Sequence, residues 1–197
     1  NLPFYSTAAA TNVNGLLEQY TNRQDDLEQV EANWVRGFDP WVIDRVGQGV
    51  PNISTDKKLK GVKSASDAGY KVIYNLKFLL DGVDGRDDLQ DYYPGSQKES
   101  NLWDALDDLL DVVGPYVDIL VVGNEPIVET KPTSWSHTYT SNWYGQSGYP
   151  IVIFYDRLSD HVLDYIDSDQ DLGHLDVYCG ALTNMDGASS SDANGYI

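Results

Sequence analysis

The chain has 197 residues, and its 31 Asp and Glu against 13 Lys and Arg give a formal net charge of −18. Such an acidic chain is a poor candidate for binding nucleic acid through a basic surface, so we expect no nucleic-acid partner. No segment approaches the roughly 18 consecutive apolar residues of a membrane span, and no membrane association is expected. The composition, 41% hydrophobic and 12% aromatic, indicates one folded domain with a sizeable core.

The sequence carries a few signs of where the protein works. Cys179 is the only cysteine, which excludes an intrachain disulfide, and its apolar surroundings predict an inert, buried thiol. Asn52-Ile53-Ser54 is a glycosylation sequon, compatible with a secreted glycoprotein. The chain begins at Asn1 without a signal-peptide pattern, which suggests a processed or partial product. The acidic, lysine-poor, aromatic-rich composition favours an extracellular protein.

Helical and strand patterns alternate along the chain. Phe4 to Ser6 is a weak candidate for a first strand. After it, in chain order, we predict a helix at Asp25 to Ala32, a strand at Asn33 to Phe38, a helix at Lys57 to Ala68 stopped by Gly69, a strand at Tyr70 to Leu76, a helix at Asn101 to Val113, a strand at Val117 to Gly123, a helix from Pro150 and a strand at Leu175 to Ala181. The four strand runs are short, rich in β-branched and aromatic residues and mostly continuous, a pattern typical of strands buried on both faces of a parallel sheet.

This alternation predicts an α/β fold built of right-handed βαβ units. Two architectures fit: an open doubly wound sheet and a (β/α) barrel. The Gly-rich turns of nucleotide-binding sheets are absent, and no cofactor is expected. Long loops follow the strands at Leu79 to Ser100 and Tyr139 to Tyr149. They favour a TIM-barrel type fold, because a barrel builds its active site from such loops.

Polar residues follow each predicted strand, at the end where a barrel has its active site. They are Arg36, Asn75, Lys77, Asn124, Glu125, Thr183 and Asn184. Glu125 is the one carboxylate among them. A carboxyl group held near apolar walls has a raised pKa, which suits a general acid at neutral pH.

These motifs resemble those of the clan A glycoside hydrolases. The resemblance rests on Trp34-Val35-Arg36 in one strand and Gly123-Asn124-Glu125-Pro126 two strands later. Clan A enzymes are retaining (β/α)₈ barrels whose fourth strand ends in Asn-Glu. With Phe4 to Ser6 counted as the first strand, Val117 to Gly123 is the fourth. The resemblance implies that Glu125 is the acid/base, that Asn124 bonds the sugar's 2-hydroxyl and that Arg36 steadies the nucleophile.

The chain departs from this family in its second carboxylate. A retaining mechanism needs a nucleophile about 5 Å from the acid/base, and clan A enzymes carry it as a Glu on the seventh strand. No other glutamate of the chain follows a predicted strand, and Glu129 is too close in sequence to face Glu125 across a sugar ring. We therefore expect residues 1–197 to be the amino-terminal portion of one barrel domain, about the first five of eight βα units. A second segment or chain would supply the nucleophile and complete the barrel.

Aromatic residues crowd the stretch that follows Glu125. Trp135, His137, Trp143 and Tyr144 are candidates for binding the sugar together with Asn75 and Lys77, because flat aromatic faces stack on sugar rings. A loop that packs its own aromatic side chains explains the pattern about equally well. No metal site is expected, since the histidines lack ligand spacing. The Asp-rich stretch from Asp81 to Asp88 also lacks the pattern of a calcium loop.

The sequence thus predicts a secreted β-glycosidase that degrades a polysaccharide or oligosaccharide by a retaining mechanism, with Glu125 as acid/base. One alternative is a non-catalytic carbohydrate-binding or scaffold protein derived from a barrel glycosidase. Another is an unrelated α/β enzyme in which Glu125 is a base acting on a carbonyl compound.

Overall fold

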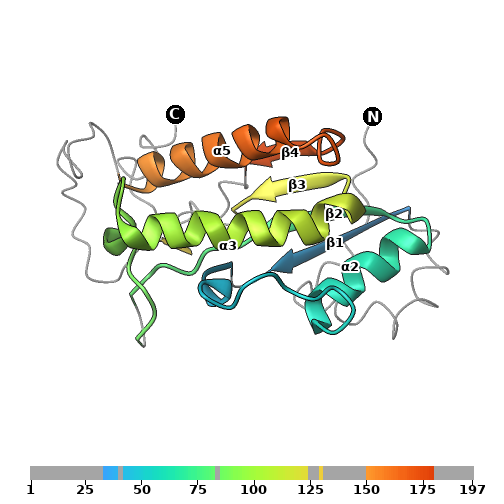
Figure 1. Cartoon of the computed structure of the whole chain (residues 1–197), viewed down its shortest axis with the longest axis horizontal. Coiled ribbons are helices and arrows are strands. Elements are labelled where there is room, and N and C mark those ends of the chain that lie inside the picture. The colour runs from blue at the N-terminus through green and yellow to red at the C-terminus, as the bar shows by residue number, and fades with distance from the viewer. Residues whose placement is uncertain (1–32, 40–41, 83–84, 124–128, 131–149, 180–197) are drawn as a thin grey trace, which may run out of the picture.

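The computed structural model describes residues 33–39, 42–82, 85–123, 129–130 and 150–179 (Figure 1). In this part of the chain it has a mixed α/β fold with one parallel sheet of four strands. The strands are β1 (Trp34–Asp39), β2 (Lys71–Leu76), β3 (Ile119–Val122) and β4 (Asp176–Cys179). The helices are α2 (Lys57–Asp67), α3 (Gln97–Val113) and α5 (Pro150–Ser168), and single 3₁₀ turns are η3 (Val42–Arg45), η4 (Leu89–Tyr92) and η5 (Gly114–Tyr116).

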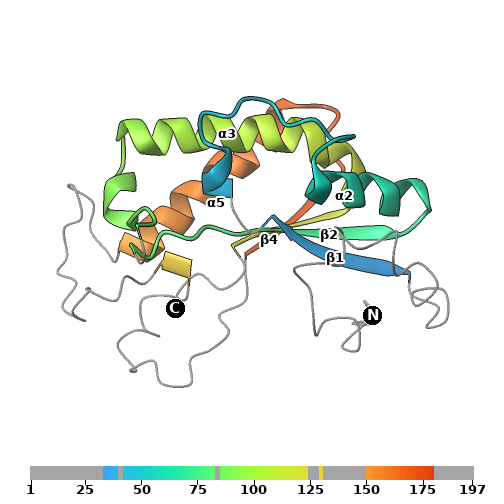
Figure 2. The ribbon, with the colours of Figure 1, turned by 90° about the horizontal axis from the view of Figure 1, so that it is seen from below.

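The strands lie in the order β1-β2-β3-β4, and all three pairings are parallel. Helix α2, α3 or α5 lies between each described strand and the next in the chain, so each of these connections is a βαβ unit. Figure 2 shows α2, α3 and α5 on the same side of this sheet. Right-handed crossovers that always step in one direction produce that arrangement. The predicted α/β class and the parallel sheet are therefore confirmed.

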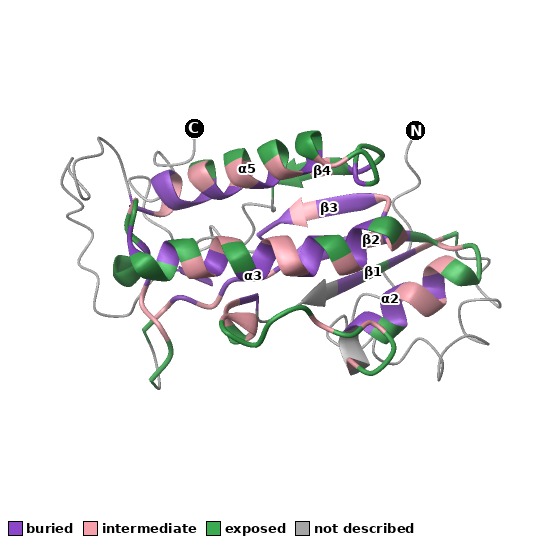
Figure 3. Cartoon of the chain, in the orientation of Figure 1, coloured by how far each residue is buried: buried purple, intermediate pink, exposed green. Residues whose placement is uncertain are grey.

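The core lies between the sheet and its three helices. In Figure 3 the helix sides that face the sheet are buried, and the opposite sides are exposed. Every second residue of the strands enters this core, including Val35, Val72, Tyr74, Leu120 and Val122. Because side chains alternate along a strand, Arg36 and Asn75 belong to the other face of the sheet.

Helix α2 ends where the sequence predicted. Gly69 adopts φ +88°, a left-handed conformation that glycine tolerates best. The N–H of Tyr70 then bonds the carbonyl of Ala65 at 3.1 Å, and the N–H of Gly69 bonds that of Ser66 at 2.9 Å. This is the glycine-based arrangement that commonly closes a helix.

Helix α3 begins at Gln97, earlier than the predicted start at Asn101. Ser96 is the N-cap residue, and its side chain accepts a hydrogen bond from the N–H of Glu99 at 3.1 Å. The Glu99 carboxylate in turn accepts from the N–H of Gly95 at 2.6 Å. This variant of a capping box stabilises a polar first turn. The spacing of apolar residues along the helix does not reveal that turn.

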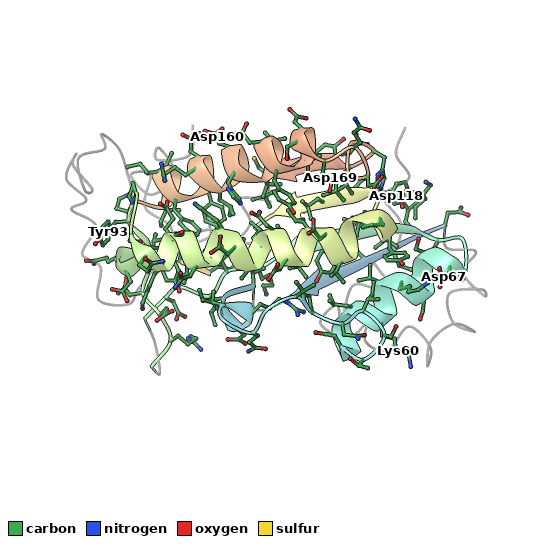
Figure 4. All side chains as sticks on the ribbon, viewed as in Figure 1. Lys60, Asp67, Tyr93, Asp118, Asp160 and Asp169 are labelled. Carbon is green, nitrogen blue, oxygen red and sulfur yellow. The ribbon has the colours of Figure 1, made fainter. Side chains whose placement is uncertain are left out.

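The two ends of the sheet are distinct. Figure 4 labels Asp118, which precedes β3, at the amino ends of the strands, and Tyr93, in the loop after β2, at the opposite end. Asp118 pairs with Lys71 and accepts a hydrogen bond from the N–H of Val72 at 2.9 Å. It therefore connects the beginnings of β2 and β3 at the amino ends of the strands.

The prediction for Cys179 is wrong. Cys179 is exposed, because it ends β4, a strand whose described hydrogen-bonding partner is β3 alone. Asp176 and Tyr178 of the same strand are exposed as well. The expectation of a strand buried on both faces thus fails for β4.

None of the helices in the described ranges is long and apolar enough to cross a membrane. The predicted helix at Asp25 to Ala32 and the candidate strand at Phe4 to Ser6 lie outside the described residues.

Candidate active site

A polar contact joins the first two strands. Asn75 lies near the carboxyl end of β2, whereas Arg36 lies in the middle of β1 and not at its carboxyl end as predicted. The Nε of Arg36, on β1, donates a hydrogen bond to the Oδ1 of Asn75, on β2, at 3.1 Å. Arg36 is opposite Ile73 in the register, two residues before Asn75, so its long side chain leans along the strand to reach the amide. Both residues were predicted to belong to the site, and the structure brings them together on the face of the sheet away from the helices.

The environments of these two side chains differ. Asn75 is fully buried, with 0% of its surface accessible, and buried amides are normally hydrogen-bonded. Arg36 is exposed as a whole residue, while partial desolvation lowers the pKa of its guanidinium below the ordinary value for arginine. Arginine stays protonated at neutral pH even so. The pair therefore presents a cation held in place by a buried amide.

Lys77 follows directly after β2 and is half-buried. Its carbonyl oxygen accepts a hydrogen bond from the N–H of Val42 at 3.3 Å, which ties the stretch after β2 to the 3₁₀ turn after β1. Lys77 therefore lies at the carboxyl end of β2, two residues after Asn75.

The third strand leads to the predicted acid/base. β3 ends at Val122, and the buried Gly123 after it has φ +74°. A left-handed glycine turns the chain sharply where a side chain would be strained. Asn124 and Glu125 come next and lie outside the described residues. The sugar-binding candidates Trp135, His137, Trp143 and Tyr144, as well as Thr183 and Asn184, lie outside them too.

Glu129 is a buried carboxyl that the sequence reasoning set aside. It is 2% exposed, and the adjacent Thr130 is 0% exposed. Its Oε2 accepts hydrogen bonds from the N–H of Phe78 at 3.1 Å and from the hydroxyl of Tyr155 at 3.4 Å. The sequence held one signal for Glu129: it is a glutamate only seven residues after the end of β3.

The Asp-rich stretch after β2 forms ion pairs within itself. Arg86 donates to both carboxylate oxygens of Asp81, at 2.7 and 2.6 Å. Lys98 donates to Asp87 at 2.7 Å and to Asp91 at 2.8 Å. Within the described ranges, no three or more His, Cys, Asp or Glu side chains are placed to hold a metal ion.

The histidines of the described part have structural partners. The ring of His161 stacks on Trp103 with centroids 4.9 Å apart. Its Nε2 lies 2.7 Å from Oδ1 of Asp107, so it links α3 to α5. His174 lies 3.1 Å from the carbonyl oxygen of Val117. Neither belongs to the carboxyl end of the sheet.

The described candidates are thus the guanidinium of Arg36 and the buried amide of Asn75, in contact on one face of β1 and β2, and Lys77, which follows β2. Such groups can bind sugar hydroxyls or steady an anion. Comparison of the chain with protein-family models, with curated proteins and with solved structures finds no match in any of the three.

Proposed function

We propose that the chain is part of a retaining β-glycosidase of the (β/α)-barrel type, in which Glu125 is the acid/base. The observation that carries the proposal is the hydrogen bond from Arg36, in the middle of β1, to Asn75, near the carboxyl end of β2. It lies on the sheet face opposite the helices, the face that becomes the interior when such a sheet closes into a barrel.

The strand order supports the barrel. In a (β/α) barrel each new strand is added beside the one before it, and all helices cover the outer face. The order β1-β2-β3-β4 with three helices on one side agrees with that plan. A doubly wound sheet reverses its strand order at a switch point and carries helices on both faces. Neither feature occurs among the described elements.

The proposed mechanism gives each residue one role. Glu125 protonates the glycosidic oxygen as the bond to the sugar breaks and later takes a proton from the attacking water. Asn124 bonds the 2-hydroxyl, and Arg36, oriented by Asn75, steadies the partner carboxylate. That carboxylate is assigned to no residue of this chain.

The substrate in this proposal is a β-linked polysaccharide or oligosaccharide. Trp135, His137, Trp143 and Tyr144 are proposed to line its binding site with Asn75 and Lys77, because aromatic faces stack on sugar rings and exclude water. The reaction consumes only water besides the glycan, so no cofactor enters the mechanism. A secreted protein would meet such substrates outside the cell.

The test is hydrolysis of a panel of aryl β-glycosides and β-glucan, mannan, xylan and galactan by the full natural gene product. The Glu125→Gln variant should lose about 10²–10⁴-fold in kcat, the usual contribution of general acid–base catalysis. Asp104→Asn, which removes an exposed carboxyl of α3, is the control and should keep full activity. Added azide should restore turnover of an activated aryl glycoside by Glu125→Gln, because azide attacks the glycosyl intermediate without needing a base.

Wild-type rates in Glu125→Gln would refute the role of Glu125. Glycan binding without any turnover would favour the non-catalytic carbohydrate-binding alternative. If the protein neither binds nor cleaves any glycan, the result would favour the remaining alternative, an unrelated α/β enzyme.

A further inference from the structure

Glu129 is a buried carboxyl for which the proposed mechanism has no use. It is 2% exposed and lies four residues after the proposed acid/base in the sequence. A buried carboxylate is costly unless hydrogen bonds compensate it. Its Oε2 receives such bonds from the N–H of Phe78 at 3.1 Å and the hydroxyl of Tyr155 at 3.4 Å.

The main chain of Glu129 makes a second connection to the same stretch. The N–H of Leu80 donates to the carbonyl oxygen of Glu129 at 2.8 Å. Side chain and main chain of one residue therefore hold the stretch after β2 at Phe78 and Leu80, two residues apart. The hydroxyl of Tyr155 adds a link to α5. In Figure 2 the short segment 129–130 indeed lies close to the beginning of α5.

The surroundings of these contacts are apolar and packed. Phe78 and Leu80 have 0% of their surface accessible. The ring of Phe78 packs edge-on against Tyr155, with centroids 6.3 Å apart, and against Phe154 at 5.9 Å. A low-dielectric environment strengthens hydrogen bonds, and of the two side-chain bonds the one from Phe78, at 3.1 Å, is shorter than the one from Tyr155, at 3.4 Å. The position of Glu129 is thus closely determined from three sides.

We propose that Glu129 is a positioning residue: it holds the chain at residues 129–130 against the stretch that follows β2 and against α5, and through the chain it supports Glu125, four residues earlier in the sequence. The inference rests on the proposed function for its catalytic consequence. Five residues, Glu125 among them, separate Gly123, at φ +74°, from Glu129, so the proposed acid/base is flanked in the sequence by two buried residues. Catalytic groups need such support because a displacement of about 1 Å can cost about 10²-fold in rate.

The kinetic test compares Glu129→Ala with Glu129→Gln in the full natural protein. Alanine removes the acceptor, and we expect kcat to fall by about 10²-fold with a much smaller change in KM. Glutamine keeps a side-chain oxygen for the Phe78 N–H and should restore most of the rate. The basic limb of the pH profile of kcat/KM should shift in Glu129→Ala, because Glu125 would titrate in altered surroundings.

A control separates positioning from general loss of stability. Glu99→Gln alters another buried carboxyl, 3% exposed, that bonds Arg157 in the helix layer. It should lower the melting temperature and leave kcat of the folded protein unchanged. If Glu129→Ala likewise keeps wild-type kcat and pH profile while folded, the proposal is overturned.

Hydrogen exchange tests the anchoring without any activity. In Glu129→Ala the amides of Phe78 and Leu80 should exchange faster, whereas the amide of Val72, which is bonded to Asp118, should keep its protection. Unchanged protection at Phe78 and Leu80 would overturn the anchor. Suppose that Phe78 and Leu80 exchange faster in Glu129→Ala, while Glu125→Gln retains full activity. These results would support the anchoring role of Glu129 and refute the proposed function.

Discussion

The ion pair between Glu99 and Arg157 allows a quantitative test of how α3 is held to α5. Arg157 donates through Nε to Oε1 of Glu99 at 2.7 Å and through Nη2 to Oε2 at 2.8 Å. The Glu99 side chain is 4% exposed and that of Arg157 38% exposed. The change is Arg157→Met, which keeps an unbranched apolar stem and removes the charge.

The expected loss follows from the burial of the partner that remains. Removing one member of a buried pair costs about 3–5 kcal/mol, because the other charge stays buried. Arg157 is partly exposed, and Glu99 keeps the hydrogen bond from the N–H of Gly95, so the expected loss is smaller than for a fully buried pair, about 2–3 kcal/mol. For a domain of this size each kcal/mol shifts the melting temperature by about 2–4 °C, which predicts a decrease of about 4–12 °C.

The assay is urea unfolding of the wild type, Arg157→Met, Glu99→Gln and the double variant, combined in a double-mutant cycle. The exposed pair Lys63–Asp67, with side chains 36% and 58% exposed, is the matched control, and its coupling should be about 0.3–0.5 kcal/mol. A coupling between Glu99 and Arg157 no larger than that of the control would refute the reasoning.

Two further predictions concern packing and pH. A Cβ added at Gly114 would lie 2.3 Å from Cδ2 of the buried Leu172, so Gly114→Ala should lose about 1–3 kcal/mol of unfolding free energy. The control is Gly173→Ala, whose Cβ meets nothing closer than 3.8 Å. Equal unfolding free energies of the two variants would contradict the packing of Gly114 against Leu172. Desolvation raises the pKa of Asp87, but hydrogen bonds from Lys98 and Tyr92 outweigh it and lower the pKa below its ordinary 3.8. The stabilising contribution of Asp87 is therefore present above that ordinary value and is lost as the pH falls through the folded pKa. Urea unfolding at neutral and acidic pH should show that acid lowers the unfolding free energy less in Asp87→Asn than in the wild type.

The elements of the fold were predictable because their patterns are strong. The continuous apolar runs predicted all four described strands, with ends within two residues for the first three. The third begins later than predicted, because Asp118 turns its carboxylate back to the N–H of Val72. The burial of β4 was not predictable, since it depends on the strand's place at the edge of the described sheet and not on its own residues.

The site was predictable only as a set of residue types. Arg36 and Asn75 were both expected at strand ends, but their contact spans 39 positions and depends on the register of two strands. The sequence reasoning excluded Glu129 as the nucleophile because it is only four residues from Glu125, and it considered no other role for this carboxyl group. Its partners Phe78 and Tyr155 lie far from it in sequence, and a single sequence does not reveal such contacts.

The order of the strands has a consequence for how this part of the chain folds. Each strand pairs with the strand that precedes it in sequence, so its template has already left the ribosome when it emerges. The sheet can therefore extend one βα unit at a time from the amino-terminal side, without waiting for distant segments. A ribosome-bound chain ending after α3 should already protect the amides shared by β1 and β2.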